Sequence, residues 1–155
     1  MAKIDVKNAP FRTGTGYPAP HDAPCRERET SPLGLLGGLR QFGVNLVRLK
    51  TGVWTGQRHW HTKEDEFVWV LEGEVVLVTD AGREVCCAGD CAAFPAGDAN
   101  GHHFINEAEA DALLLTVGTR DMEDECHYPD IDLHAFPGRY KNLAVFRHKD
   151  GTPYD

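Results

Sequence analysis

The sequence predicts an all-β protein of one domain, and three observations carry that prediction. Short runs of alternating apolar and polar residues recur through the middle of the chain, with turn-forming residues between them at regular intervals. No stretch keeps the period of an amphipathic helix. A chain of 155 residues is long enough for a single buried core. Regularly spaced short strands are typical of antiparallel sandwiches and barrels, and we expect a small β-barrel here.

The strands of this barrel are predicted in order along the central part of the chain. We expect them at residues 44–49, 58–62, 66–71, 75–78, 83–87, 91–94, 102–106 and 113–117. The runs 66–71 and 75–78 flank Gly73 and are predicted to form a hairpin, because glycine suits the backbone of a tight turn. A second turn around Gly82 should return the chain through 83–87.

Two flanking segments differ from this pattern in composition. Residues 1–38 are rich in proline and glycine and are predicted to form an irregular N-terminal arm with at most one short strand. Residues 39–118 would form the barrel core. Residues 119–155 again carry proline, glycine and charge, but their aromatic residues predict that they pack on the barrel or on a partner subunit.

Composition excludes several classes of function. The net charge of −8 argues against a nucleic-acid partner, which needs clustered lysine and arginine. No apolar run reaches the length of about 20 residues that a membrane span needs, and the charged first residues do not resemble a signal peptide. Five cysteines, an odd number, fit a reducing compartment, so we expect a cytoplasmic protein. Arg40, Arg48 and Arg58 are candidates for an anionic ligand, although a solvated strand face is their more common role.

The stretch His59-Trp60-His61, followed by Glu66, predicts a metal site. Histidines at positions i and i+2 of a strand project from the same face, so their imidazoles can meet at one point. Glu66 could add an oxygen ligand from a paired antiparallel strand. Imidazole and carboxylate ligands together suit a divalent transition metal. Histidines placed by chance on a polar strand face are the alternative.

A second stretch, residues 89–106, completes a resemblance to the cupin superfamily, whose two short motifs supply three histidines and a glutamate to one metal ion. The first motif matches at His59, His61, Glu66 and Gly73, with its leading glycine one place early at Gly52. The second motif matches at Gly89, Pro95 and Gly97, but its histidine position holds Asn100.

The missing histidine is restored if the turn after Gly97 is two residues longer. His102 and Asn106 then keep the expected spacing, and an insertion of two residues leaves strand parity unchanged. His102 would face the interior and His103 would face outward, so His102 is the predicted third histidine ligand and His103 the weaker candidate. Asn106 could orient an imidazole or hold a strand end.

The resemblance implies a small single-domain cupin, a double-stranded β-helix or jelly-roll barrel. It implies one divalent transition metal ion per chain (Zn, Mn, Fe or Ni) on His59, His61, Glu66 and His102, and a homodimer. Two positions around a six-coordinate ion would remain for a small-molecule ligand. Such a site fits an isomerase acting on a sugar phosphate or a dioxygenase, and also a non-catalytic module that binds a carbohydrate or carboxylate. No catalytic base is identified, with Glu74 and Tyr140 as weak candidates.

Overall fold

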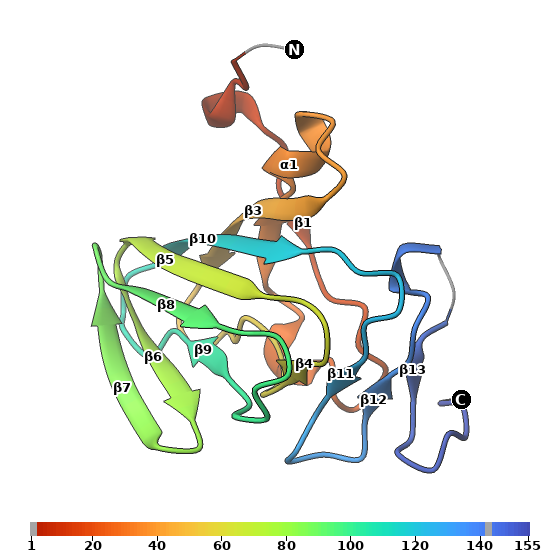
Figure 1. Ribbon diagram of the computed structural model, residues 1–155. Helices are drawn as coiled ribbons and strands as arrows, with labels where there is room; N and C mark the ends of the chain where they lie inside the picture. The colour runs from red at the N-terminus through yellow and green to blue at the C-terminus, as the bar shows by residue number, and fades with distance from the viewer. Residues whose placement is uncertain (1–2, 142–143) are drawn as a thin grey trace.

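The computed structural model describes residues 3–141 and 144–155, and nearly all of its regular structure is β (Figure 1). The strands are β1 (Arg12–Thr13), β2 (Glu29–Ser31), β3 (Phe42–Leu49), β4 (Trp60–His61), β5 (Glu66–Glu72), β6 (Glu74–Thr79), β7 (Gly82–Cys87), β8 (Cys91–Phe94), β9 (His103–Ile105), β10 (Ala112–Thr119), β11 (Cys126–His127), β12 (His134–Ala135) and β13 (Phe146–Arg147). The helices are one short α-helix, α1 (Leu33–Leu36), and the 3-10 turns Val6–Asn8, Ala23–Cys25 and Arg139–Lys141. The predicted all-β fold is confirmed.

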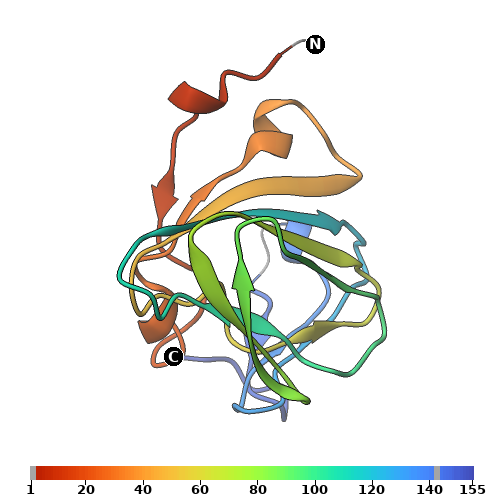
Figure 2. The same cartoon turned by 90° about the vertical axis from the view of Figure 1, so that its left-hand side faces the viewer.

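Three antiparallel sheets organise the described residues. The largest has the strand order β1-β2-β3-β10-β5-β8, and a second has the order β7-β6-β9. The third is a ribbon of very short strands in the order β13-β12-β11-β4. In Figure 1 the first two sheets form the barrel, and the ribbon lies beside its open end. Figure 2, turned by a quarter, shows the same barrel end-on with the C-terminal strands below it.

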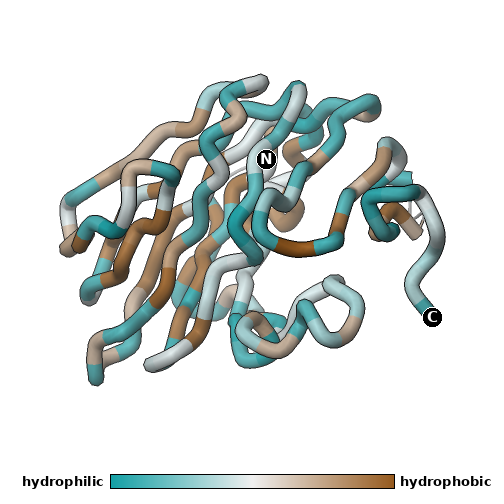
Figure 3. The backbone as a smooth tube through the Cα atoms, turned by 90° about the horizontal axis from the view of Figure 1, so that it is seen from below, coloured by the Kyte–Doolittle hydropathy of each residue, from teal (hydrophilic) through white to brown (hydrophobic). Residues whose placement is uncertain are grey.

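The barrel core lies between the two larger sheets. Alternate residues of each strand point inward, as expected for a period of two: Val47 and Leu49 on β3, Val68 and Val70 on β5, Val75 and Leu77 on β6, and Ala112 and Leu114 on β10. Phe104 on β9 and Cys86 on β7 join this cluster. Figure 3 shows apolar and hydrophilic residues following one another along the strands of the barrel.

One predicted connection is wrong. β5 and β6 do not form a hairpin, because β5 pairs with β10 and β8, whereas β6 pairs with β7 and β9. Gly73 carries the chain from one sheet to the other, with a φ of 77°. A Cβ at this position would lie 2.6 Å from the carbonyl oxygen of Asp111, so only glycine fits without a shift of the backbone. The predicted return from β6 to β7 around Gly82 is present.

The flanking segments contain more structure than their composition indicates. The N-terminal arm adds two strands, β1 and β2, to the edge of the large sheet at β3. Helix α1 buries Leu33 and Gly34 against β3 and leaves Leu35 and Leu36 exposed. The C-terminal segment supplies β11, β12 and β13 and has its own small core of Cys126, Tyr128, Leu133, Ala135 and Val145. In the part of the chain that the structure describes, no helix is long and apolar enough to cross a bilayer.

Candidate metal centre

The four predicted ligands come from three segments that meet at the mouth of the barrel, with His59 and His61 on the same one. His61 lies on β4, and Glu66 is the first residue of β5. His59 and His102 face each other in an isolated β-bridge, in which each amide N–H donates to the other residue's carbonyl oxygen, at 3.2 and 2.9 Å. The expectation that Glu66 reaches the histidines from a strand paired with theirs is wrong, since β4 pairs with β11. A loop of residues 62–65 brings Glu66 there instead.

All three imidazoles converge on one carboxylate oxygen. The Nε2 atoms of His102, His59 and His61 lie 2.8, 3.4 and 3.6 Å from Glu66 Oε2. This oxygen is buried and, despite its closeness to His102, makes no hydrogen bond with acceptable geometry. Atoms that ligate one ion at about 2.1 Å are themselves about 3.0 to 3.4 Å apart. The spacing about this oxygen and its lack of a hydrogen-bond partner suit a divalent transition metal, and one ligand atom from each of His59, Glu66 and His102 lies within 4.8 Å of the others.

Contacts on the far side of two rings hold them in the required orientation. His59 Nδ1 is 2.7 Å from the carbonyl oxygen of Gln57, and His61 Nδ1 is 2.6 Å from Asp124 Oδ2. A proton donated from Nδ1 leaves the lone pair on Nε2, the atom that faces Glu66. His102 is held differently, by stacking on Phe94 at 3.5 Å between ring centroids, and its buried Nδ1 has no partner among the described residues.

Charge and burial perturb the proton affinities of the cluster. Burial alone would raise the pKa of Glu66, but the imidazoles of His102, His59 and His61 outweigh it and hold that pKa well below its usual range. Burial lowers the pKa of His102. For His61 burial acts in the same direction, but Asp124 and Glu66 outweigh it and leave the pKa raised. Glu66 is therefore a carboxylate at neutral pH, as a metal ligand must be.

The structure places His102, and not His103, in this cluster. His103 faces the opposite side of β9, as the parity argument predicts, but it is buried and not exposed to solvent. Its Nδ1 is 2.9 Å from the carbonyl oxygen of Gly56, and its ring meets Trp54 edge-on. Asn106 does not orient an imidazole: its amide donates to the carbonyl oxygens of Leu49 and Ala110, so it holds a strand end.

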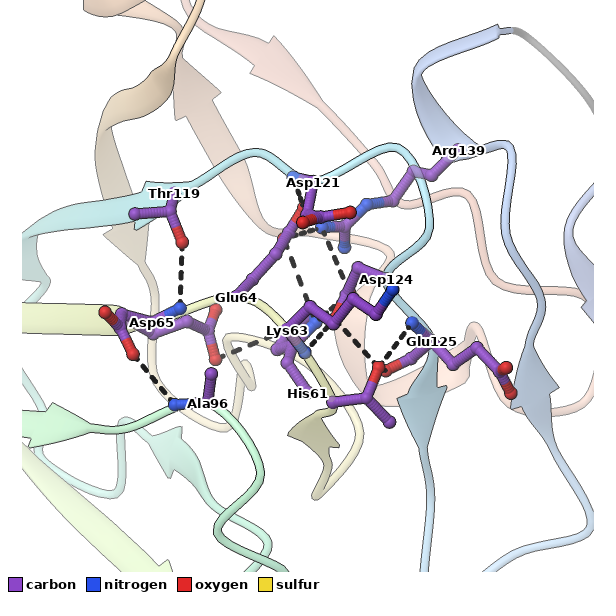
Figure 4. A network of polar contacts seen from close by, with 12 residues as sticks. His61, Lys63, Glu64, Asp65, Ala96, Thr119, Asp121, Asp124, Glu125 and Arg139 are labelled. Atoms are coloured by element: carbon purple, nitrogen blue, oxygen red, sulfur yellow. Dashed lines mark hydrogen bonds and ion pairs between the residues drawn. The ribbon is translucent and has the colours of Figure 1, made fainter.

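A buried network of acidic residues lies behind His61 (Figure 4). Asp124 accepts the amide N–H of Lys63 at 2.8 Å in addition to its contact with His61. Glu64 accepts the hydroxyl of Tyr140 at 2.6 Å and forms an ion pair with Arg139. Sequence reasoning missed Asp124, because the connection from β10 to β11 brings it beside His61, and Arg139, which follows β12. It also missed Glu64, which is close to His61 in the chain but whose burial leaves no local signal.

A cavity of about 390 Å³ opens onto the three imidazoles and Glu66. Three arginines line it, Arg28, Arg120 and Arg139, and only Arg139 forms an ion pair within the described residues. The buried Nε of Arg28 has no hydrogen-bond partner there, while its Nη1 donates to the carbonyl oxygen of Thr55 at 2.5 Å. Tyr140 also lines the cavity, and Glu74 does not.

The arginines suggested by the sequence lie elsewhere. Arg48 pairs with Glu29, Arg58 pairs with Asp80 and Asp130, and neither they nor Arg40 line the cavity. Arg28 belongs to the arm and Arg120 follows β10, where no local pattern distinguishes them from other surface arginines.

Comparison with known proteins agrees with the fold and the motifs. A family model described as the cupin domain matches residues 45–118. A sugar phosphate isomerase from the cupin superfamily, from Silicibacter pomeroyi DSS-3, is 44% identical, with a TM-score of 0.92 over 99% of this chain and 97% of that one. The chain therefore belongs to the cupin superfamily.

More distant structures show how far the fold extends. A candidate sugar phosphate isomerase from Acidithiobacillus ferrooxidans is 26% identical, with a TM-score of 0.69 over 79% of this chain and 82% of that one. The polyketide cyclase RemF from Streptomyces resistomycificus is 19% identical, with a TM-score of 0.63 over 78% and 80%, and shares the fold alone. No curated protein matches the chain.

Proposed function

We propose that this chain is a metal-dependent isomerase that acts on a sugar phosphate. The observation that carries the proposal is the composition of the cavity, which joins the histidine–glutamate cluster to two arginines, Arg28 and Arg120, that have no carboxylate partner among the described residues. A cation and an anion site within one cavity suit a substrate with polar hydroxyls at one end and a phosphate at the other. The isomerase from Silicibacter pomeroyi supports the same substrate class.

His59, His61, Glu66 and His102 would hold one divalent ion, with Zn, Mn, Fe and Ni all compatible with such ligands. The bound ion would supply Lewis-acid chemistry, polarising a carbonyl or hydroxyl oxygen of the sugar. Asp124 would keep the proton of His61 on Nδ1, so that Nε2 stays free. Arg28 and Arg120 would bind the phosphate and orient the sugar.

Isomerisation of an aldose to a ketose moves one proton from C2 to C1 and a second from the C2 hydroxyl to the C1 oxygen, and the carbon step needs a group that accepts and returns its proton. Glu64 and Tyr140 line the cavity as a hydrogen-bonded pair, with 2.6 Å between Oε1 and the phenol oxygen. We assign the transfer to this pair. Arg139, bound to Glu64, would hold that carboxylate in position.

Turnover of sugar phosphates by protein loaded separately with Zn, Mn, Ni or Fe(II) tests the function. We expect isomerisation in the absence of dioxygen, which NMR of the sugar carbons would detect. Activity on the corresponding sugars without phosphate should be much weaker. Oxygen consumption with Fe(II) alone would indicate a dioxygenase. Binding without product for every metal would indicate a non-catalytic module. Light scattering on the same samples tests the predicted homodimer.

Variants of the arginines test the phosphate site. Arg28→Gln and Arg120→Gln should each raise KM by about 10- to 100-fold, because a charged hydrogen bond is worth about 1.5 to 3 kcal/mol. Arg40→Gln removes the same charge outside the cavity and should leave KM unchanged. Equal effects of all three substitutions would mean that net charge, and not a local contact, governs binding.

A further inference from the structure

The ribbon that carries His61 has a second cluster of metal-binding side chains on its other face. β11 pairs with β4 so that Cys126 lies opposite His61 and His127 lies opposite Trp60. Because neighbouring residues of a strand point to opposite faces, His61 and Cys126 line the cavity while Trp60 and His127 face away from it. None of the four residues of the cavity cluster takes part in the outer one.

Pairing with the next strand brings a second histidine beside His127. His127 and His134 are direct partners across β11 and β12, and their rings meet edge-on with 4.5 Å between centroids. Directly opposed residues of antiparallel strands have their side chains on the same face. Both imidazoles therefore project from the outer side of the ribbon.

Glu125 completes the cluster from the same face, two residues before His127. Its backbone is fixed by Thr62, which donates its amide N–H to the Glu125 carbonyl at 3.0 Å and accepts the Glu125 N–H on its hydroxyl at 3.0 Å. In Figure 4 its carboxylate points away from the network of Glu64, Asp124 and Arg139. Glu125 Oε2 lies 2.7 Å from His134 Nε2, and one ligand atom from each of the three residues lies within 4.8 Å of the others.

We propose that Glu125, His127 and His134 bind a second divalent transition-metal ion on the outer face of the ribbon. Two imidazoles and one carboxylate favour Ni, Cu or Zn over the oxygen-preferring Mg and Ca. The separation of 2.7 Å between Glu125 and His134 is close to the roughly 3 Å expected for neighbouring ligand atoms of one ion. The Glu125 side chain is 39% exposed, so an ion can reach the site from solvent.

The alternative is a purely structural role, in which Glu125 and His134 form an ion pair and His127 packs on Trp60. Arg147 lies opposite His134 on β13 and adds positive charge nearby, which weakens cation binding. Its guanidinium, however, lies over the ring of Phe136, at 5.9 Å from the centroid, and donates to the carbonyl oxygen of Gly151. The two interpretations differ in whether an ion is bound.

Equilibrium dialysis of the untagged full chain against Ni²⁺, followed by elemental analysis, separates them. The double variant His127→Gln/His134→Gln should hold one equivalent less than wild type, whatever the cavity cluster holds. This difference keeps the proposal separate from the proposed isomerase function. His148→Gln is the matched control, because His148 also contacts a carboxylate, that of Asp132 at 2.7 Å, but lies outside the cluster. It should keep the wild-type content.

Trp60 provides an optical signal for the same site. Its ring stacks on His127 with 4.2 Å between centroids, so bound Ni²⁺ should quench its fluorescence. Trp60→Phe should keep the Ni²⁺ content and lose that quenching. If circular dichroism shows that the double variant does not fold, Glu125→Gln provides the test instead. Its affinity for the second Ni²⁺ ion should be at least tenfold weaker than that of wild type. Equal Ni²⁺ content in wild type and in the folded cluster variants would overturn the proposal.

Discussion

Asp124→Asn should weaken metal binding at the cavity although Asp124 is not itself a predicted ligand. Asp124 accepts from His61 Nδ1 at 2.6 Å and from the Lys63 amide at 2.8 Å, with its side chain only 4% exposed. Burial alone would raise its pKa, but His61 and Lys63 lower it, so the group is a carboxylate at neutral pH. Asparagine has one acceptor oxygen and cannot keep both contacts.

The loss has two parts. An asparagine NH₂ facing His61 Nδ1 favours the tautomer with the proton on Nε2, which then cannot bind metal. Replacing such an outer partner typically lowers metal affinity about 10- to 100-fold, or about 1.4 to 2.7 kcal/mol. The metal-free protein should also lose about 1.5 to 3 kcal/mol of stability, since a buried hydrogen bond to a charged group is lost.

Competition against a fluorescent chelator measures the affinity, and urea unfolding of the metal-free protein measures the stability. Asp132→Asn is the matched control. Asp132 contacts His148 Nδ1 at 2.7 Å in the same manner, but it is 62% exposed and remote from the cavity cluster. An affinity of Asp124→Asn within twofold of both wild type and Asp132→Asn would refute the reasoning.

Three further predictions concern the fold. Gly73→Ala should lower the free energy of unfolding in urea by about 3 kcal/mol, because a Cβ there meets a backbone oxygen at 2.6 Å. Gly38 has nearly the same φ but open space around it, so Gly38→Ala should lower that free energy by about 1 to 2 kcal/mol. Leu114→Ala, at a fully buried position, should lower the free energy of unfolding by about 2 to 5 kcal/mol. Leu35→Ala, at an exposed position, should change it by no more than about 0.5 kcal/mol. Similar urea midpoints for the two variants would contradict the core assignment. Burial lowers the pKa of His103 to about 4, so as the pH falls the unfolded chain binds a proton at this residue before the folded chain does. The stability that this group contributes is therefore complete above pH 6.5 and is lost as the pH falls towards 4. Between pH 6.5 and 4, the free energy of unfolding of the metal-free His103→Gln variant should therefore fall by about 2 to 3 kcal/mol less than that of wild type. The same fall in both proteins would count against this assignment.

Local patterns were sufficient for the barrel strands. The alternation in residues 66–71 and 113–117 matches β5 and β10, because one face of each strand is buried and the other is not. Pairing was harder to predict: Gly73 reads as a hairpin turn, yet it joins two sheets. A glycine with positive φ allows both connections, and the partner strands β9 and β10, distant in sequence, decide between them.

For the candidate site, the sequence alone determined the four proposed ligands. His59, His61 and Glu66 follow from their spacing and strand periodicity, whereas His102 was added by the resemblance to the second cupin motif, with strand parity favouring it over His103. Tertiary structure decided everything around them. Arg28 and Arg120 reach the cavity, and Asp124 reaches His61, through the packing of both flanking segments on the barrel, and contacts between residues far apart in the chain leave no periodic signal in the sequence.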